Sequence, residues 1–184
     1  MRAHALFRRS VIVVVLFALG AVACGDGADT RPTSQTQEPA FPPPVSPYEP
    51  HIDPADFVAS IDNPYMPLEP GTTLVYEGQS DGEEEENTIV VTDRTKEILG
   101  VTCTVVKDIV TVEGVIAEKT FDWFAQDRYG NVWYFGEISK EYEDGKFAGL
   151  EGSWEAGVDG ALAGIVMLGD PKVGDEYRQE YYAG

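Results

Sequence analysis

Apolar and polar residues alternate along most of the chain between Thr73 and Tyr142. A period of two places successive side chains on opposite faces of a strand, so the pattern predicts β-strands with one buried face. Turn sequences interrupt the alternation at Leu99-Gly100 and Glu113-Gly114. The expected strands are residues 73–79, 88–98, 101–112, 115–125 and 132–142.

Short connections make antiparallel pairing of consecutive strands the default, and Asp144-Gly145 predicts a further hairpin. We therefore expect a mainly β fold: an antiparallel meander forming a strongly curved sheet or partial barrel, with one or two short helices. Asp53 followed by Pro54 predicts a helix start, with the helix running to about Ser60. Residues 150–171 lack strand character, and a short helix is expected at 161–168. Residues 175–182 are expected to return to a strand.

In an alternating strand, the apolar positions predict which face is buried. In 115–125, one face should carry Val115, Ala117, Phe121 and Trp123, opposite Glu118, Thr120 and Asp122. In 132–142, Val132, Tyr134, Ile138 and Tyr142 should share a face. In 101–112 the apolar side changes near Lys107 and Asp108, which predicts a β-bulge there.

The first residues follow a different pattern. Arginines precede an uncharged apolar run from Val11 to Ala23, which is typical of a secretory signal and short for a membrane-spanning helix. Its end, Ala21-Val22-Ala23-Cys24, resembles the bacterial lipobox, although Ala21 replaces the usual leucine. The resemblance implies that Cys24 is lipidated and becomes the mature N-terminus, with two acyl chains for stable anchoring. The alternative is ordinary signal-peptide cleavage with an unmodified cysteine. Arg8-Arg9 also partly matches a twin-arginine signal, so the export route stays open.

Eight of the twelve prolines lie between Pro32 and Pro54, in a stretch with almost no apolar residues. Such a segment does not bury enough surface to offset its ordering entropy. We expect three regions: a signal peptide at 1–23, a lipidated cysteine with a disordered tether at 24–54, and a β-rich domain at 55–184. The abrupt end after the last expected strand suggests that the domain continues beyond the sequence.

The charge is strongly negative. Removing the signal takes away three of the 13 basic residues and leaves 32 acidic ones, so the mature chain carries a formal charge of −22. This charge repels phosphate backbones, so nucleic acid is not expected as a partner.

Few residues in the expected domain suit catalysis. The mature chain contains one histidine, His51, and it lies in the tether, which excludes histidine-based triads and metal clusters from the domain. Two carboxylate pairs remain as candidates for acid–base chemistry on glycans, Asp122 with Asp127 and Glu155 with Asp159. Asp127 and Asn131, around Gly130, are either turn caps or calcium ligands, and the turn interpretation is preferred. No cofactor is expected.

Two further sets of residues have structural and functional interpretations. Cys103 alternates with valines, which favours a buried inert thiol over a nucleophile, while a Cys24–Cys103 disulfide is the alternative that would refute lipidation. Aromatic residues are most simply core. Their functional interpretation is a concave pocket for a lipid or an envelope glycan, lined by Trp123, Trp133, Tyr134 and Trp154.

Several motifs resemble an uncharacterised family of membrane lipoproteins from actinobacteria-type genomes. They are Ile61-Asp62-Asn63-Pro64-Tyr65-Met66-Pro67-Leu68, Asp122-Trp123-Phe124-Ala125-Gln126-Asp127, Gly130-Asn131-Val132-Trp133-Tyr134-Phe135-Gly136-Glu137 and Gly152-Ser153-Trp154-Glu155-Ala156-Gly157-Val158-Asp159-Gly160. The resemblance implies a lipid-anchored domain and supplies no reaction or catalytic residue.

The leading functional hypothesis is a lipid-anchored, non-enzymatic binding or interaction domain at the outer, extracytoplasmic face of the cell membrane. The alternatives are a carrier of a lipid or other apolar ligand and a carboxylate-based enzyme acting on glycans. The expected partners are the membrane, through the anchor, and a cell-envelope ligand or protein.

Overall fold

The computed structural model describes residues 48–80 and 82–182. The predicted signal peptide, Cys24 and most of the predicted tether lie outside these residues. Within them, no helix is both long enough and apolar enough to cross a membrane.

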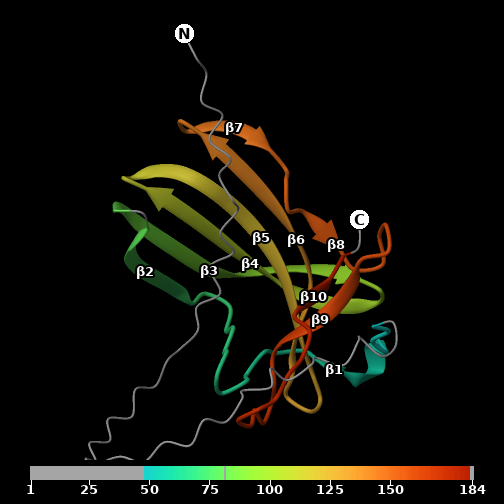
Figure 1. The fold of residues 1–184 in the computed structure, drawn as a ribbon. Helices are drawn as coiled ribbons and strands as arrows, with labels where there is room; N and C mark the ends of the chain where they lie inside the picture. Colours follow the sequence, from blue (N-terminus) through green and yellow to red (C-terminus); the bar gives the residue numbers. More distant parts are fainter. Residues whose placement is uncertain (1–47, 81, 183–184) are drawn as a thin grey trace, which may run out of the picture. The chain divides into compact units, whose positions relative to one another are not determined.

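The described residues form one antiparallel sheet that curls into a half-barrel (Figure 1). The sheet order is β10-β9-β6-β5-β4-β3-β2, while β1 pairs with β5 and both β7 and β8 pair with β6. The mainly β, strongly curved fold predicted from the sequence is therefore confirmed. The strands are β1 (Phe57–Val58), β2 (Thr73–Ser80), β3 (Glu83–Ile98), β4 (Val101–Val112), β5 (Val115–Asp127), β6 (Val132–Glu143), β7 (Lys146–Gly149), β8 (Trp154–Glu155), β9 (Leu162–Met167) and β10 (Glu180–Tyr181).

The meander from β2 to β6 follows the predicted strands, and β3 is longer than expected. Its tight turns have the backbone that the sequence predicts. Leu99, Glu113 and Asp144 have φ near +50°, and the glycine after each also has positive φ. Two consecutive positive φ values match the right-handed twist of the flanking strands, so these turns set the hairpin registers.

The first helix prediction is right about the start and wrong about the length, and the second is wrong. Asp53 does cap a turn, but only Pro54–Asp56 forms a 3-10 turn, and Phe57 then enters β1 to pair with Asp127. Residues 161–168 contain the strand β9, which pairs with β6 and β10. A Cβ at Gly164 would collide with the backbone of Arg178 and Gln179, so the glycine permits this close approach. The final strand is shorter than expected, Glu180–Tyr181.

The predicted bulge in β4 is also wrong. Residues 104–110 of β4 pair without interruption with residues 124–118 of β5. One irregularity lies in β3, between Val91 and Thr95, and another lies in β5, where Ala117 is an extra residue between the pairs Val110–Glu118 and Thr111–Ile116. Val115 therefore lies on the face opposite Phe121 and Trp123, so the prediction that they share a face is wrong. The apolar side of β4 changes because both faces of the strand are partly buried. Val105 packs in one hydrophobic cluster on one face, and Val106 packs in a different cluster on the other face.

An irregularity between β5 and β6 divides the face predicted for β6. Tyr134 pairs with Phe124, whereas Ile138 pairs with Phe121, a residue on the opposite side of β5. Two residues of β6, Phe135 and Gly136, oppose one residue of β5 at this bulge, and Gly136 has a φ of +129°. The prediction that Ile138 and Tyr142 share a face with Val132 and Tyr134 is therefore wrong.

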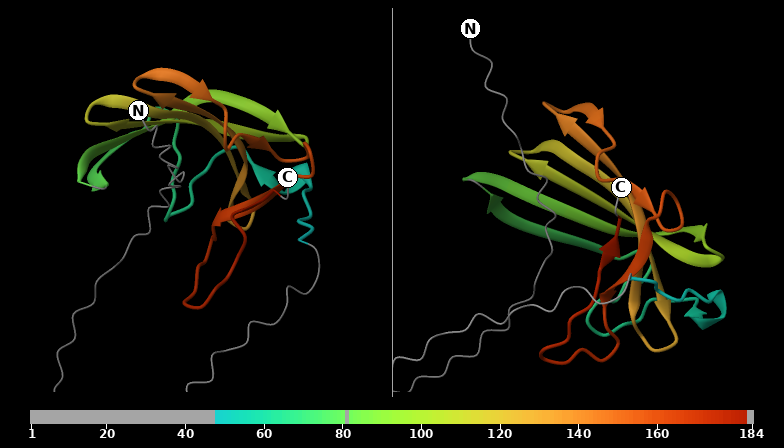
Figure 2. Two further views of the ribbon diagram at one scale, coloured as in Figure 1. Left: turned by 45° about the horizontal axis from the view of Figure 1, so that its top comes forward. Right: turned by 45° about the vertical axis from the view of Figure 1, so that its right-hand side comes forward.

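Cross-strand partners share a face of the sheet, so the register defines two faces. The concave face carries Val91, Val106 and Val132, which pack with Ile61 and Leu68. The segment from Ile61 to Leu68 passes beneath the arch of the sheet in the left view of Figure 2. The other, convex face carries Cys103, Val105 and Trp123.

Hydrogen bonds fix the Ile61–Leu68 segment at one end of the concave face. The buried Asn63 donates through Nδ2 to the carbonyl oxygens of Gly130 (2.7 Å) and Leu168 (3.0 Å). Gln126 Oε1 accepts from the backbone N–H groups of Asp62 and Asn63. This end of the face is therefore covered by chain.

Candidate functional site

The sheet separates charge between its two faces. In the central residues 104–110, 118–122 and 137–141 of β4, β5 and β6, every basic side chain lies on the convex face and every acidic side chain on the concave face. The basic residues are Lys107, Lys119 and Lys140. The acidic residues, which we call the concave acidic cluster, are Asp108, Glu118, Asp122, Glu137 and Glu141.

The cluster is built by cross-strand pairing. Asp122 is opposite Glu137, and Glu118 is opposite Glu141. Between these two pairs, Asp108 is opposite Thr120. Directly opposed residues have Cβ atoms about 4.5–5.5 Å apart, so acidic side chains face each other at close range.

Asp122 is tied to an aromatic group. Tyr134 Oη donates to Asp122 Oδ1 at 2.7 Å. The Tyr134 ring stacks on the Phe124 ring with centroids 4.8 Å apart, and the Trp154 ring packs edge-on against the Tyr134 ring with centroids 5.2 Å apart. Burial raises the pKa of Asp122 well above its usual value and outweighs the lowering by the Tyr134 hydrogen bond. Burial, with the neighbouring Asp122 carboxyl, raises the pKa of Tyr134 as well.

Two other members of the cluster have raised pKa values. Burial raises the pKa of Glu137 to about 7, and Glu118 is the acidic neighbour that adds most to the rise. Burial raises the pKa of Asp108 to about 6, where the hydrogen bond from Asn87 acts in the opposite direction. Uncharged carboxyls and carboxylates therefore coexist on this face near neutral pH.

Three buried polar atoms of the described residues have no hydrogen-bond partner, and all belong to this face: Asn87 Oδ1, Asp108 Oδ1 and Trp154 Nε1. Asn87 Nδ2 donates to Asp108 Oδ2 at 3.3 Å, which leaves each residue with one unpaired acceptor. An unsatisfied buried polar group costs about 1–3 kcal/mol, so the concave face is incomplete in hydrogen bonding.

The four aromatic residues predicted to line a pocket are divided between the faces. Trp123 lies on the convex face, under Lys96 Nζ, which is 3.4 Å from its ring centroid and pairs with Glu155. Trp133 opposes Ala125 on the same face. Tyr134 and Trp154 contact each other on the concave face. A ligand pocket formed by all four stays a prediction.

Neither predicted carboxylate pair comes together on one face. Asp127 faces away from Asp122 along β5, and its carboxylate accepts from four donors: the backbone N–H groups of Tyr129 and Asn131, Asn131 Nδ2 and Trp133 Nε1. These bonds confirm the turn-cap interpretation. Asp159 lies exposed in a turn with φ of +49°, while Glu155 pairs with Lys96 at 2.6 Å.

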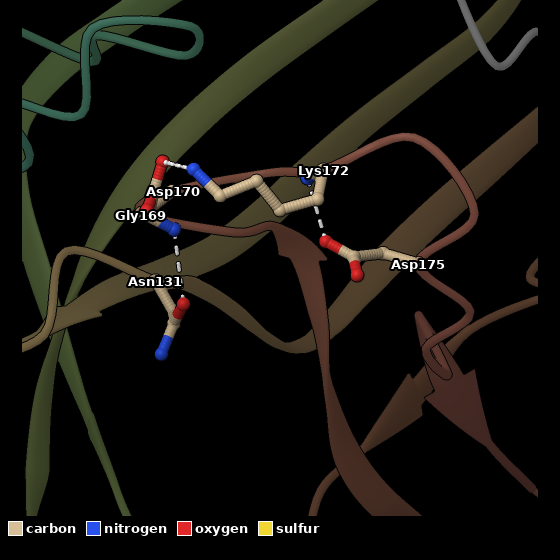
Figure 3. Close-up of polar contacts among 5 residues, drawn as sticks. All are labelled: Asn131, Gly169, Asp170, Lys172 and Asp175. Atoms are coloured by element: carbon tan, nitrogen blue, oxygen red, sulfur yellow. Dashed lines mark hydrogen bonds and ion pairs between the residues drawn. The ribbon is translucent and has the colours of Figure 1, made fainter.

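The side chain of Asn131 also makes structural hydrogen bonds. Its Oδ1 accepts from the Gly169 N–H at 2.9 Å, which ties the β5–β6 turn to the end of β9 (Figure 3). Beyond it, the Lys172 N–H donates to Asp175 Oδ2 at 2.7 Å, and the Lys172 ammonium pairs with Asp170. In residues 48–80 and 82–182, no group of three or more acidic, histidine or cysteine side chains has a geometry suited to a metal ion.

Cys103 is fully buried, and burial raises the pKa of its thiol to about 12. This confirms the prediction of a buried thiol and disfavours a nucleophilic thiolate.

The sequence analysis missed several residues of this face, among them Asn87, Glu141 and Glu137, the partner of Asp122. Glu137 lies in the predicted strand 132–142, and only the bulge at Phe135–Gly136 places it opposite Asp122. Comparisons of the chain with protein-family models, with curated proteins and with solved structures find no match.

Proposed function

We propose that the protein is an exported, lipid-anchored, non-enzymatic binding domain at the outer face of the cell membrane, and that the concave face of its sheet is the binding surface. The observation that carries the binding surface is the set of buried, unpartnered polar atoms of Asn87, Asp108 and Trp154 on that face. A bound partner would supply the missing hydrogen bonds. The anchor rests on Ala21-Val22-Ala23-Cys24.

The chemistry of this face favours a polar partner over an apolar one. A lipid tail on the centre of the concave face would lie against Asp108, Asp122 and Glu137. Carboxyl groups pressed against hydrocarbon lose hydration without gaining a hydrogen bond, which is costly. The carrier of an apolar ligand is therefore the weaker candidate.

The surface assignment is tested with a photo-reactive side chain placed at neighbouring positions of β6. Glu141 lies on the concave face and Lys140 on the convex face, and both are partly buried. We expect light-induced adducts in the native host from position 141 and not from position 140, measured by mass spectrometry of the purified full chain. Equal adducts at both positions, or none at 141, would contradict the assignment.

The anchor is tested separately. Replacing Cys24 by serine is expected to remove lipid labelling and to release the protein into the medium or leave it as unprocessed precursor, measured by fractionation and metabolic labelling with a fatty acid. Cys103→Ala is the matched control and should keep both the label and the membrane location, because Cys103 is buried in the core. A lipid label that persists in Cys24→Ser would refute the anchor.

A further inference from the structure

We propose that the concave acidic cluster docks a lysine- or arginine-rich segment of a partner protein. This inference rests on the proposed function, since it takes the concave face as the binding surface and names the chemistry of its partner.

The first support is charge complementarity. The ion pairs within the described residues are Lys96–Glu155, Arg128–Asp56 and Lys172–Asp170, and none includes a member of the concave acidic cluster. The nearest strand lysines, Lys107, Lys119 and Lys140, point to the other face. Five carboxyl groups thus face one another with no cation from their own strands.

The second support is independent of charge. Trp154 has an exposed fraction of only 9%, yet its indole N–H has no acceptor. Register places Trp154 directly opposite Glu137, so its side chain stands at the border of the cluster. A buried N–H without an acceptor points to a bound group that accepts a hydrogen bond.

A basic polypeptide supplies both kinds of group that this face lacks. Its ammonium or guanidinium groups would donate to the carboxylates and, when the side chains that cover them move aside on binding, to the unpaired oxygens of Asn87 and Asp108. Its backbone carbonyl oxygens would accept from Trp154 Nε1. A simple polyamine provides the donors alone, and an anionic glycan would be repelled by the cluster.

Spacing on the sheet is also compatible with an extended segment. Along β5, Glu118 and Asp122 are four residues apart on one face, as are Glu137 and Glu141 along β6. A strand rises about 3.3 Å per residue, so each pair spans about 13 Å. Alternate side chains of an extended peptide repeat at about half that distance, so basic residues in such a segment reach successive carboxyls.

The test uses the full chain purified in detergent and a fluorescent peptide that alternates lysine with serine. We expect saturable binding that weakens as salt is raised, because the contacts are charged. The triple variant Glu118→Gln, Glu137→Gln, Glu141→Gln should bind at least about tenfold more weakly. The control triple variant Glu77→Gln, Glu84→Gln, Glu86→Gln removes the same number of carboxyl groups from the convex side of β2 and β3 and should bind within about twofold of the wild type.

A second pair of measurements separates a peptide site from general attraction of cations. Trp154→Phe keeps the aromatic packing and removes the N–H, so it should weaken binding of the lysine–serine peptide and leave binding of spermidine unchanged. Equal weakening by the two triple variants would overturn the proposal, and so would a peptide that binds no better than spermidine. A peptide alternating glutamate with serine that binds as tightly would overturn it as well.

Failure here is distinguishable from failure of the proposed function. If photo-adducts form at position 141 but the basic peptide does not bind, the concave face is a binding surface for a partner of different chemistry. If neither is seen, both the proposed function and this inference are refuted.

Discussion

At the scale of single residues, Asp127 stabilises the end of the sheet where the concave face is closed. Its buried carboxylate accepts from two backbone N–H groups and from the side chains of Asn131 and Trp133. Asn131 Oδ1 in turn accepts a hydrogen bond from the Gly169 N–H. Asp127 thereby connects the turn after β5 directly to β6, through Trp133, and indirectly to the end of β9, through Asn131.

Replacing Asp127 by alanine is expected to lower the free energy of unfolding by about 3 kcal/mol, because hydrogen bonds to a charged acceptor are worth about 1.5–3 kcal/mol each and four partly buried donors lose their partner. Urea unfolding of the full chain measures this. Asp170→Ala is the control, since Asp170 is exposed and pairs with the exposed Lys172, and it should change stability by less than about 0.5 kcal/mol. Similar losses in both variants would contradict the role of Asp127.

At the scale of elements, the predictions succeeded where local sequence fixes the structure. Strict alternation and turns such as Asp144-Gly145 carry enough information to define the hairpins of the meander. The strand β9 was missed because Leu162–Met167 has no alternation, and it is a strand only because β6 and β10 flank it. Tertiary pairing there overrides a pattern that is ambiguous by itself.

The candidate site was predictable only in part for a related reason. The sequence correctly places Glu118, Thr120 and Asp122 on one face of β5. It gives no sign that Glu137 joins them, because the bulge at Phe135–Gly136 changes the side of β6 on which each residue lies. A one-residue shift moves every following side chain to the other face, so bulges limit any prediction of a site made from alternation.

At the scale of the whole molecule, the folded sheet concentrates like charge instead of dispersing it. The carboxyl of Glu137 faces Tyr134, with Glu118, Asp108 and Glu180 as acidic neighbours on the strands around it. Burial, aided by these neighbours, raises its pKa from 4.5 to about 7, and burial raises the pKa of Asp108 from 3.8 to about 6. Folding therefore favours the protonated form of both groups.

This preference fixes the sign of the pH dependence. Between the unfolded pKa values near 4 and the folded values of about 6 and 7, the native protein binds more protons than the unfolded chain. Stability consequently falls as pH rises through that window and levels off above it. The direction is opposite to that of a carboxylate stabilised by a salt bridge.

The full chain without a partner is therefore expected to be more stable at pH 5 than at pH 8, by on the order of 2 kcal/mol, because one pKa unit corresponds to about 1.4 kcal/mol and both groups are partly exposed. Glu137→Gln should raise stability at pH 8 and change it little at pH 5, since it replaces a repelled carboxylate by a neutral amide. Urea titrations at the two pH values measure both effects. Glu77→Gln, on the exposed edge strand β2, should shift stability equally at both values. A stability that stays constant or rises from pH 5 to pH 8 would show that the cluster is neutralised from within the chain, and the concave face would then have no unmet charge to offer a basic partner.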